Sequence, residues 1–364
     1  MALPSSYSAA FAALAIAASA VLAATALARA ATPAEQLYAE LAKLPQAERE
    51  KRLVEGAQKE AKFVVRPVFR GANARDHHKI FQARYPNAKI ETLDQGNTEV
   101  GVELMIAEEK AGRHLTDSMG LNSPDIEPLI NRDLLAVYRT PVTDAILPRY
   151  RGFLDPQNRW VPWNWIEHGA SYNTALMKAE DAPKSYMDFC DPKYKGQNSM
   201  EPSEPKWLAG IYLMMGEETF TKWIDCVSKN EPILQAGHTS RSTLMLAGDH
   251  AISMDSFFYR GFALNKENPR KAPFAIDWDV PILAFASIQT INKNTAQPYG
   301  AALFSDWVLS EESQKYLYSI YRGPLTIPHP MIKDDAQIFV YGPVKEEVLK
   351  RAAELWAVKV GRKK

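Results

Sequence analysis

Apolar positions along the chain follow two alternating patterns, helical spacing and short continuous runs. Leucines at helical spacing predict two short helices over 35–62. The segments that follow are predicted as a strand over 63–69, a helix that ends before Pro86, a strand over 88–93 and a helix over 97–112. Repeated strand, turn and helix units are typical of a doubly wound α/β architecture. A final amphipathic helix is predicted over 344–360 and is expected to pack back on the body.

Polar turns mark the predicted ends of strands. In doubly wound sheets, ligands bind at the carboxyl ends of strands, beside the N-termini of helices. The turns of this kind are 70–73, 120–124 and 237–240. In the second turn, Ser123 is a good N-cap and Pro124 a good first helical residue. Unpaired N–H groups and positive helix ends at these turns would suit an anionic or strongly polar ligand group.

The start of the chain has the pattern of an export signal. From Ala9 to Ala28 nearly every residue is apolar, and Ala28-Arg29-Ala30 supplies the small residues of an A-x-A cleavage site. We predict a signal peptide over 1–30 and a periplasmic mature protein. An uncleaved anchor stays open as the alternative, because no basic residue precedes the run and its length approaches the roughly 20 residues that span a bilayer.

Export changes the meaning of the two cysteines, Cys190 and Cys226. In an oxidising compartment they could form a structural disulfide. The alternative is two buried thiols. A disulfide requires Cα atoms roughly 4.4–6.8 Å apart. The sequence does not give this distance, so both interpretations stay open at this point.

Composition limits the classes of partner. The 364 residues include 43 Lys and Arg against 43 Asp and Glu, so the chain provides no summed positive field for a nucleic acid, and none is expected as a partner. A hydrophobic fraction of 46% excludes intrinsic disorder. The length predicts about two domains, since single cores stop growing at roughly 250–300 residues.

Short stretches of the chain resemble, in order and spacing, the extracellular solute-binding proteins of ABC importers, in the group that contains the ferric-ion-binding proteins. These stretches are 53–62, 107–117, 171–173, 191–196 and 301–314. The resemblance implies a type II periplasmic-binding-protein fold, in which two α/β lobes are joined by hinge strands around a ligand cleft. It also implies capture of a small solute by hinge closure and delivery to a permease of the inner membrane, without catalysis and without a cofactor.

The resemblance also divides the chain into lobes. It places lobe 1 at 31–160 plus 275–320 and lobe 2 at 165–270. The segment 321–364 is expected to pack back on lobe 2. We expect a monomer whose partners are a small molecule and the ABC permease.

One stretch departs from the ferric-binding members, in which adjacent tyrosines supply phenolate oxygens to iron. Here it reads Asp255-Ser256-Phe257-Phe258-Tyr259, and phenylalanine has no atom that binds a metal. If Phe257 and Phe258 occupy the tyrosine positions, the iron site is absent. If the register shifts by one, only Tyr259 remains. We therefore expect a small organic anion as the ligand and no metal, with ferric iron as the alternative.

The expected ligand-binding residues come from the loops of both lobes. A guanidinium can bind a carboxylate or phosphonate bidentately, which favours Arg70 and Arg241. Aromatic side chains such as Trp163 and Trp165 could line the cavity or belong to the core. The expected set is Arg70, Asn122, Ser123, Lys206, His238, Thr239, Ser240, Arg241, Asp255, Ser256 and Tyr259.

Motifs for catalysis or metal binding are weak. His77 and His78 are adjacent, so on a helix they point about 100° apart, and His77 is expected to pack against apolar neighbours. Ser203 and Lys206 match S-x-x-K formally, but the S-D-N and K-T-G motifs of serine acyl-enzymes are missing. An exported enzyme and a ligand-sensing ectodomain on the same fold stay as alternatives.

Overall fold

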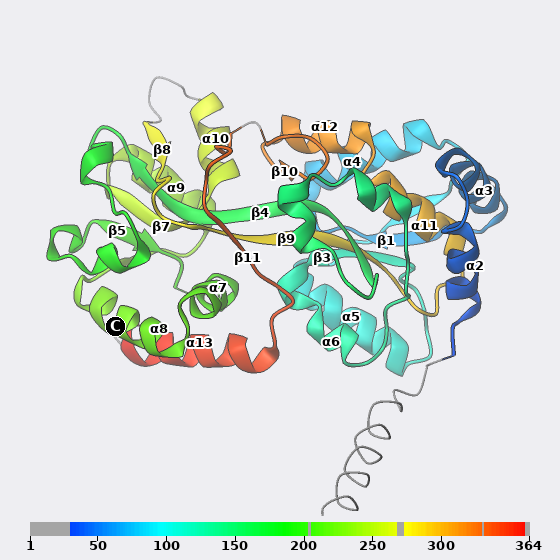
Figure 1. Ribbon diagram of the computed structural model, residues 1–364, viewed down its shortest axis with the longest axis horizontal. Coiled ribbons are helices and arrows are strands. Elements are labelled where there is room, and N and C mark those ends of the chain that lie inside the picture. The colour runs from blue at the N-terminus through cyan, green and yellow to red at the C-terminus, as the bar shows by residue number, and fades with distance from the viewer. Residues whose placement is uncertain (1–29, 203–204, 268–272, 330, 361–364) are drawn as a thin grey trace, which may run out of the picture.

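Two α/β lobes lie side by side along the long axis of the molecule, and two long strands run through both (Figure 1). The computed structural model describes residues 30–202, 205–267, 273–329 and 331–360, so the predicted signal peptide, apart from Ala30, lies outside the described residues. The connecting strands are β4 (Trp160–Asn173) and β9 (Ile282–Ile291), which pair antiparallel and are buried along their whole length. The predicted two-lobed α/β fold is confirmed.

Within the described chain, the strands form one mixed sheet in the order β2-β1-β3-β9-β4-β7-β5-β6. The other strands on this path are β1 (Phe63–Arg66), β2 (Ile90–Thr92), β3 (Ser118–Asn122), β5 (Asn198–Met200), β6 (Ile233–Leu234) and β7 (Ile252–Phe257). Pairing is parallel among β2, β1 and β3 and among β7, β5 and β6, as the doubly wound prediction requires. It is antiparallel where β3, β9, β4 and β7 meet.

Three short strands extend the middle of the sheet. They are β8 (Phe274–Ile276), β10 (Gly323–Pro324) and β11 (Ile338–Val340). β8 and β10 pair with β4, and β11 pairs with β9. The C-terminal part of the chain is therefore held against both connecting strands.

The first lobe has its own helices and core. Its helices are α2 (Pro33–Leu41), α3 (Gln46–Lys59), α4 (Gly71–Arg84), α5 (Thr98–Lys110), α6 (Glu127–Ile130), α11 (Pro298–Trp307) and α12 (Glu311–Ser319). Local chemistry explains where they begin: the Asn97 side chain accepts a hydrogen bond from the backbone N–H of Val100 at 2.8 Å and caps α5. The core contains Phe63, Leu121 and Trp307.

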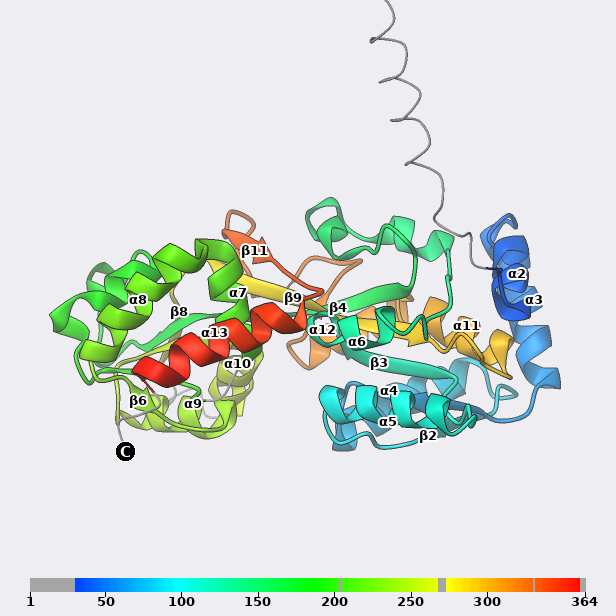
Figure 2. The same cartoon turned by 90° about the horizontal axis from the view of Figure 1, so that it is seen from below.

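The second lobe is built around a separate cluster of buried residues that includes Met200, Trp207, Trp223, Ile252 and Trp356. Its helices are α7 (Pro205–Met215), α8 (Glu217–Lys229), α9 (His238–Ala247), α10 (Phe258–Glu267) and α13 (Glu346–Lys359). The predicted C-terminal helix, α13, lies along α7 and α8 (Figure 2). No helix in the described parts of the chain is both long and apolar enough to cross a bilayer.

The lobe boundaries are less simple than the chain order implies. Within the segment 321–364, Leu325 and Ile332 pack in the core of the first lobe, whereas Phe339, Tyr341 and Val344 pack with the second. Phe258 and Phe262 of α10 also pack with the first core. The boundaries stay predictions, but the tail contacts both lobes and not lobe 2 alone.

Short 3-10 helices lie in the connections between these elements. They are η1 (Ser123–Asp125), η2 (Pro141–Ala145), η3 (Pro148–Phe153), η4 (Ala179–Asp181), η5 (Tyr186–Cys190) and η6 (Pro192–Tyr194). The helix predicted to begin after Ser123 is only this short turn, and no side chain caps it. The turn 120–124 therefore offers no strong helix end to an anion.

His77 and the two tryptophans belong to the core. The His77 ring lies 5.0 Å from the Trp163 ring and 4.5 Å from the Trp307 ring, measured between ring centroids, and its burial confirms the predicted packing role. Trp163 and Trp165 are both buried in the first core, so of the two positions left open for them the core is the one they occupy.

A disulfide joins Cys190 and Cys226, whose Cα atoms are 5.2 Å apart. The bond ties η5 to α8 across a sequence separation of 36 residues. We expect its reduction to lower the free energy of unfolding by about 4 kcal/mol, because the unfolded chain regains the entropy of an open loop of this length. Urea unfolding with and without reductant measures the loss.

The double variant Cys190→Ala/Cys226→Ala is the control for this experiment, since reductant should then change nothing. Titration of free thiols in the unfolded, unreduced protein provides a second measurement. Two reactive thiols would show that the bond does not form.

Candidate ligand-binding cleft

A cavity of about 410 Å³ lies between the lobes, which is within the usual range for a small-molecule site. The connecting strands form part of its wall through Ile166, Phe285 and Ser287. The other lining residues are Val68, Phe69, Arg70, Asn73, Asn97, Thr98, Glu99 and Asn122 from the first lobe, Lys206, His238, Phe257, Tyr259 and Arg260 from the second, and Arg322 from the segment before β10. Strand ends and helix starts from both lobes therefore meet here, as the sequence predicts.

Three arginines dominate the charge of the cavity: Arg70, Arg260 and Arg322. The guanidinium carbon of Arg322 lies 3.7 Å from the centre of the Tyr259 ring, and that of Arg260 lies 5.0 Å from the same ring. Cation–π contacts of this kind hold a guanidinium without neutralising it. Among the residues that the structure describes, no carboxylate lies within ion-pairing distance of these three groups.

Arg322 also acts on the pKa of a carboxyl group in the connecting strand β4, beside the cavity. Glu167 of β4 is buried, with 1% of its surface exposed. Burial raises the pKa of Glu167 to about 8, although the charge of Arg322 acts in the opposite direction. The side chain is therefore mostly protonated at neutral pH, and it leaves the charge of the arginines uncompensated.

Lys206 contributes a fourth cation, but carboxylates surround it. Its ammonium nitrogen lies 2.5 Å from Glu99 Oε1 and 3.0 Å from Asp125 Oδ2. Burial raises the pKa of Asp125 to about 6, against the opposing charge of Lys206. The Thr98 hydroxyl donates a hydrogen bond to the same carboxylate.

The structure brings part of the predicted set together. Arg70, Asn122, Lys206, His238 and Tyr259 line the cavity. The remaining predicted residues do not line it: Ser123, Thr239, Ser240, Arg241, Asp255 and Ser256. The difference follows from which way each side chain points at the end of its strand or helix, which the sequence pattern did not resolve.

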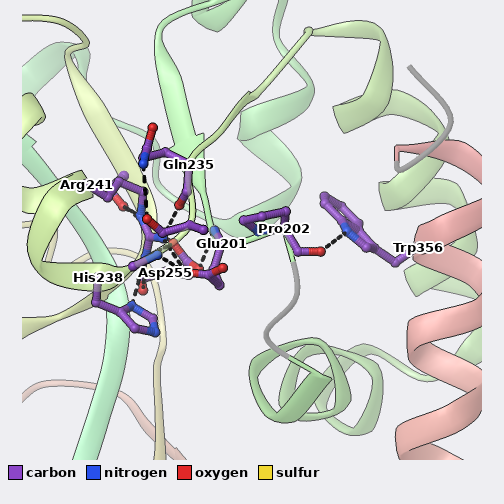
Figure 3. A network of polar contacts seen from close by, with 10 residues as sticks. Glu201, Pro202, Gln235, His238, Arg241, Asp255 and Trp356 are labelled. Atoms are coloured by element: carbon purple, nitrogen blue, oxygen red, sulfur yellow. Dashed lines mark hydrogen bonds and ion pairs between the residues drawn. The ribbon is translucent and has the colours of Figure 1, made fainter. Parts of the chain in front are cut away.

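Arg241 was expected in the cleft, but it does not line the cavity and is buried in a network of polar contacts (Figure 3). Its guanidinium is 2.8 Å from Asp255 Oδ1 and 3.4 Å from Glu201 Oε2, and it donates a hydrogen bond to the Gln235 carbonyl at 3.1 Å. Its Nη2 also lies 2.9 Å from Nδ1 of His238, one helical turn earlier. Arg241 therefore supports the first turn of α9, which carries His238, and does not line the cavity.

Other predicted residues that do not line the cavity are also held elsewhere or point to solvent. The Ser256 hydroxyl lies 2.6 Å from that of Ser171, and the Ser123 hydroxyl accepts a hydrogen bond from the backbone N–H of Ala286 at 3.3 Å. Both pairs are buried and hold the β4–β7 and η1–β9 contacts together. Thr239 and Ser240 are exposed in the first turn of α9.

Sequence reasoning missed several residues of the cavity, above all Arg260, Arg322 and Glu99. Arg260 follows Tyr259 directly, so the stretch that was compared with the iron ligands contained the signal. Arg322 had no local signal, because pairing of β10 with β4 brings it to the cleft from the other end of the chain.

Comparisons with known proteins agree with this architecture. Residues 115–338 match the family described as bacterial extracellular solute-binding proteins. No curated protein sequence matches the chain.

Similar solved structures include iron-bound HitA from Pseudomonas aeruginosa, with 18% identity, coverage of 82% of this chain and 98% of that chain, and a TM-score of 0.67. IdiA (FutA) of Trichodesmium, solved with iron and citrate, is 14% identical, with coverage of 83% of this chain and 100% of that chain and a TM-score of 0.68. AfuA of Actinobacillus pleuropneumoniae, solved with fructose-6-phosphate, is 19% identical, with coverage of 83% of this chain and 100% of that chain and a TM-score of 0.64. At these identities the likeness shows the fold, a type II periplasmic-binding-protein fold. Because the family match spans more than half of the chain, the protein belongs to the bacterial extracellular solute-binding proteins.

Proposed function

We propose that this protein is the periplasmic substrate-binding component of an ABC importer, and that its ligand is a small organic anion. The observation that carries the proposal is the set of three arginines, Arg70, Arg260 and Arg322, which line one interlobe cavity without a carboxylate at ion-pairing distance among the described residues. The solute would be released unchanged to a permease of the inner membrane.

The charge of the cavity supports an anion because it is local. The whole chain has a formal net charge of zero, so attraction must arise from the few cations inside the cleft. A site that excludes water strengthens each of these contacts relative to bulk solvent. A guanidinium pairs well with planar or tetrahedral oxyanions such as carboxylate, phosphate and phosphonate.

The apolar part of the lining supports an organic body on the ligand. Phe69, Phe257 and Phe285 line the cavity together with the Tyr259 ring. Flat apolar surfaces of this kind bind carbon-rich groups while a few polar groups set the orientation. A solute with an anionic head and a small carbon skeleton matches both parts of the lining.

Ferric iron is the second candidate, since iron is bound in the HitA structure and iron with citrate in that of IdiA. In this chain Phe257 and Tyr259 line the cavity, whereas Phe258 is buried in the core of the first lobe. Only one phenol therefore comes from that stretch, and two arginines stack on its ring. A bare trivalent cation would be repelled by these groups, which favours the anion.

A thermal-shift screen tests the class of ligand. The compounds are organic acids, amino acids, phosphonates, sugar phosphates, thiamine-like compounds and ferric iron, each added to refolded protein that is free of copurified solute. A solute at about 100 times its Kd adds about 2.7 kcal/mol to the free energy of unfolding, so a hit raises the melting temperature. A response confined to ferric iron, with a phenolate-to-iron absorption band in the visible, would replace the anion with iron.

Arg322→Met tests the role of the arginines with the compound found in that screen. We expect its Kd to rise by about 10- to 100-fold, the effect of losing one charge-assisted hydrogen bond. Isothermal titration calorimetry measures the change. Arg113→Met is the matched control, because Arg113 is exposed and does not line the cavity. An equal Kd for both variants would remove Arg322 from the site.

A further inference from the structure

Lys206 connects the two lobes through charge. It lies in the first turn of α7, whose next residues Trp207 and Leu208 pack in the core of the second lobe. Its partners Glu99 and Asp125 belong to the first lobe, in α5 and η1. Each ion pair therefore crosses the cleft from one core to the other.

The exposure of these groups distinguishes the trio from ordinary surface ion pairs. The Lys206 side chain is 11% exposed and that of Asp125 is 6% exposed, whereas Glu99 remains 50% exposed. The hydroxyl of Thr98, next to Glu99, donates a hydrogen bond to Asp125 and holds that carboxylate in place on the first lobe. The ammonium fits between two oxygen atoms that its own lobe does not supply.

Separation of the lobes on this side would break these pairs. Each lobe has its own cluster of buried residues, and β4 and β9 run continuously from one to the other. A buried ion pair adds little net stability, since desolvation offsets the Coulomb attraction, but it can select one arrangement over others. Here the arrangement that satisfies Lys206, Glu99 and Asp125 together is the one with the cleft closed on this side.

We propose that Lys206, Glu99 and Asp125 form an interlobe latch, which holds the cleft closed on the α5–α7 side before any solute binds. The latch goes beyond the proposed function, because it sets the balance between open and closed lobes in the solute-free protein. Its three members line or adjoin the same cavity as the arginines, so a solute meets a site in which one cross-lobe contact is already made.

Distances between the lobes test the latch without a ligand. Spin labels are attached at Glu103→Cys in α5 and Lys229→Cys in α8, two exposed positions on different lobes. Pulsed dipolar spectroscopy on refolded, solute-free protein then gives the distribution of interlobe distances. In Lys206→Met we expect the ratio of open to closed molecules to rise at least about fivefold, the low end of ordinary coupling between two states.

Lys293→Met is the matched control. Lys293 is also a mostly buried lysine in an ion pair, but its partner Asp133 lies in the same lobe. Its removal should leave the distance distribution unchanged. If Lys206→Met gives the same distribution as the control, the latch does not exist.

A double-mutant cycle separates a latch from a general structural effect of Lys206. In an Asp125→Asn/Glu99→Gln background, Lys206→Met should shift the distribution no further, because both carboxylates of the latch have already lost their charge. Additive shifts would overturn the proposal. If Lys206→Met unfolds, Glu99→Gln alone decides, since that side chain is half exposed and its loss leaves the core intact. None of these results depends on whether the solute is an anion.

Discussion

Arg241→Met is expected to lower the free energy of unfolding by about 3–5 kcal/mol, because it removes the cation that faces two buried carboxylates. Asp255 is fully buried, and the side chain of Glu201 is 9% exposed. The methionine can fill much of the space of the arginine stem, but it leaves both negative charges without the guanidinium. Urea unfolding followed by tryptophan fluorescence measures the loss.

Arg351→Met is the control for this experiment. Arg351 pairs with Glu217 at 2.6 Å, but both side chains are about half exposed, and exposed pairs contribute about 0–1 kcal/mol. If Arg241→Met lowers the free energy of unfolding by less than about 1 kcal/mol, as the control does, the buried ion pairs of Arg241 do not stabilise the fold. Arg241 does not line the cavity but contacts His238, which does. The variant therefore tests structural support of the site and not a direct contact with the ligand.

Glu167→Gln is expected to change how stability depends on pH. The pKa of Glu167 is raised to about 8 by burial, whereas an unfolded glutamate titrates near pH 4.3. Between these values the native state binds the proton and the unfolded state does not, so the contribution of Glu167 to wild-type stability falls as pH rises. The slope is at most about 1.4 kcal/mol per pH unit for a single group.

Glutamine resembles the protonated carboxyl and does not titrate. The stability of Glu167→Gln relative to wild type should therefore increase from about pH 4.5 to about pH 8 and stay constant above that. Other buried carboxyls, such as Asp125 and Asp277, whose pKa values are also raised to about 6, cancel in this difference. Glu103→Gln, an exposed change, is the control. Parallel profiles for wild type and Glu167→Gln would contradict the prediction.

Much of the local structure was predictable because it depends on neighbouring residues. The helices α3, α4, α5 and α9 lie where apolar spacing and turn residues place them. The order of strands and helices predicted a doubly wound α/β architecture, and the resemblance to solute-binding proteins implied its division into two lobes. The helix after Ser123 was the exception, since a good N-cap and Pro124 were followed by only a short 3-10 turn.

The cleft was predicted in part. Arg70, His238 and Tyr259 lie at strand ends or helix starts, and their position in the chain was a correct guide to the cavity. Arg241 shows the limit of this reasoning. Its distance from the turn 237–240 along the chain is small, but its side chain extends toward β7 and pairs with Asp255.

The amino-acid sequence was sufficient for features that short-range interactions decide, namely helical spacing and turns. Tertiary structure alone decided which charges share the cleft. Arg322 reaches it through the pairing of β10 with β4, and Lys206 meets Glu99 only because the two lobes face each other. Side-chain direction and contacts between distant segments depend on packing of the whole chain, and a linear pattern does not encode them one residue at a time.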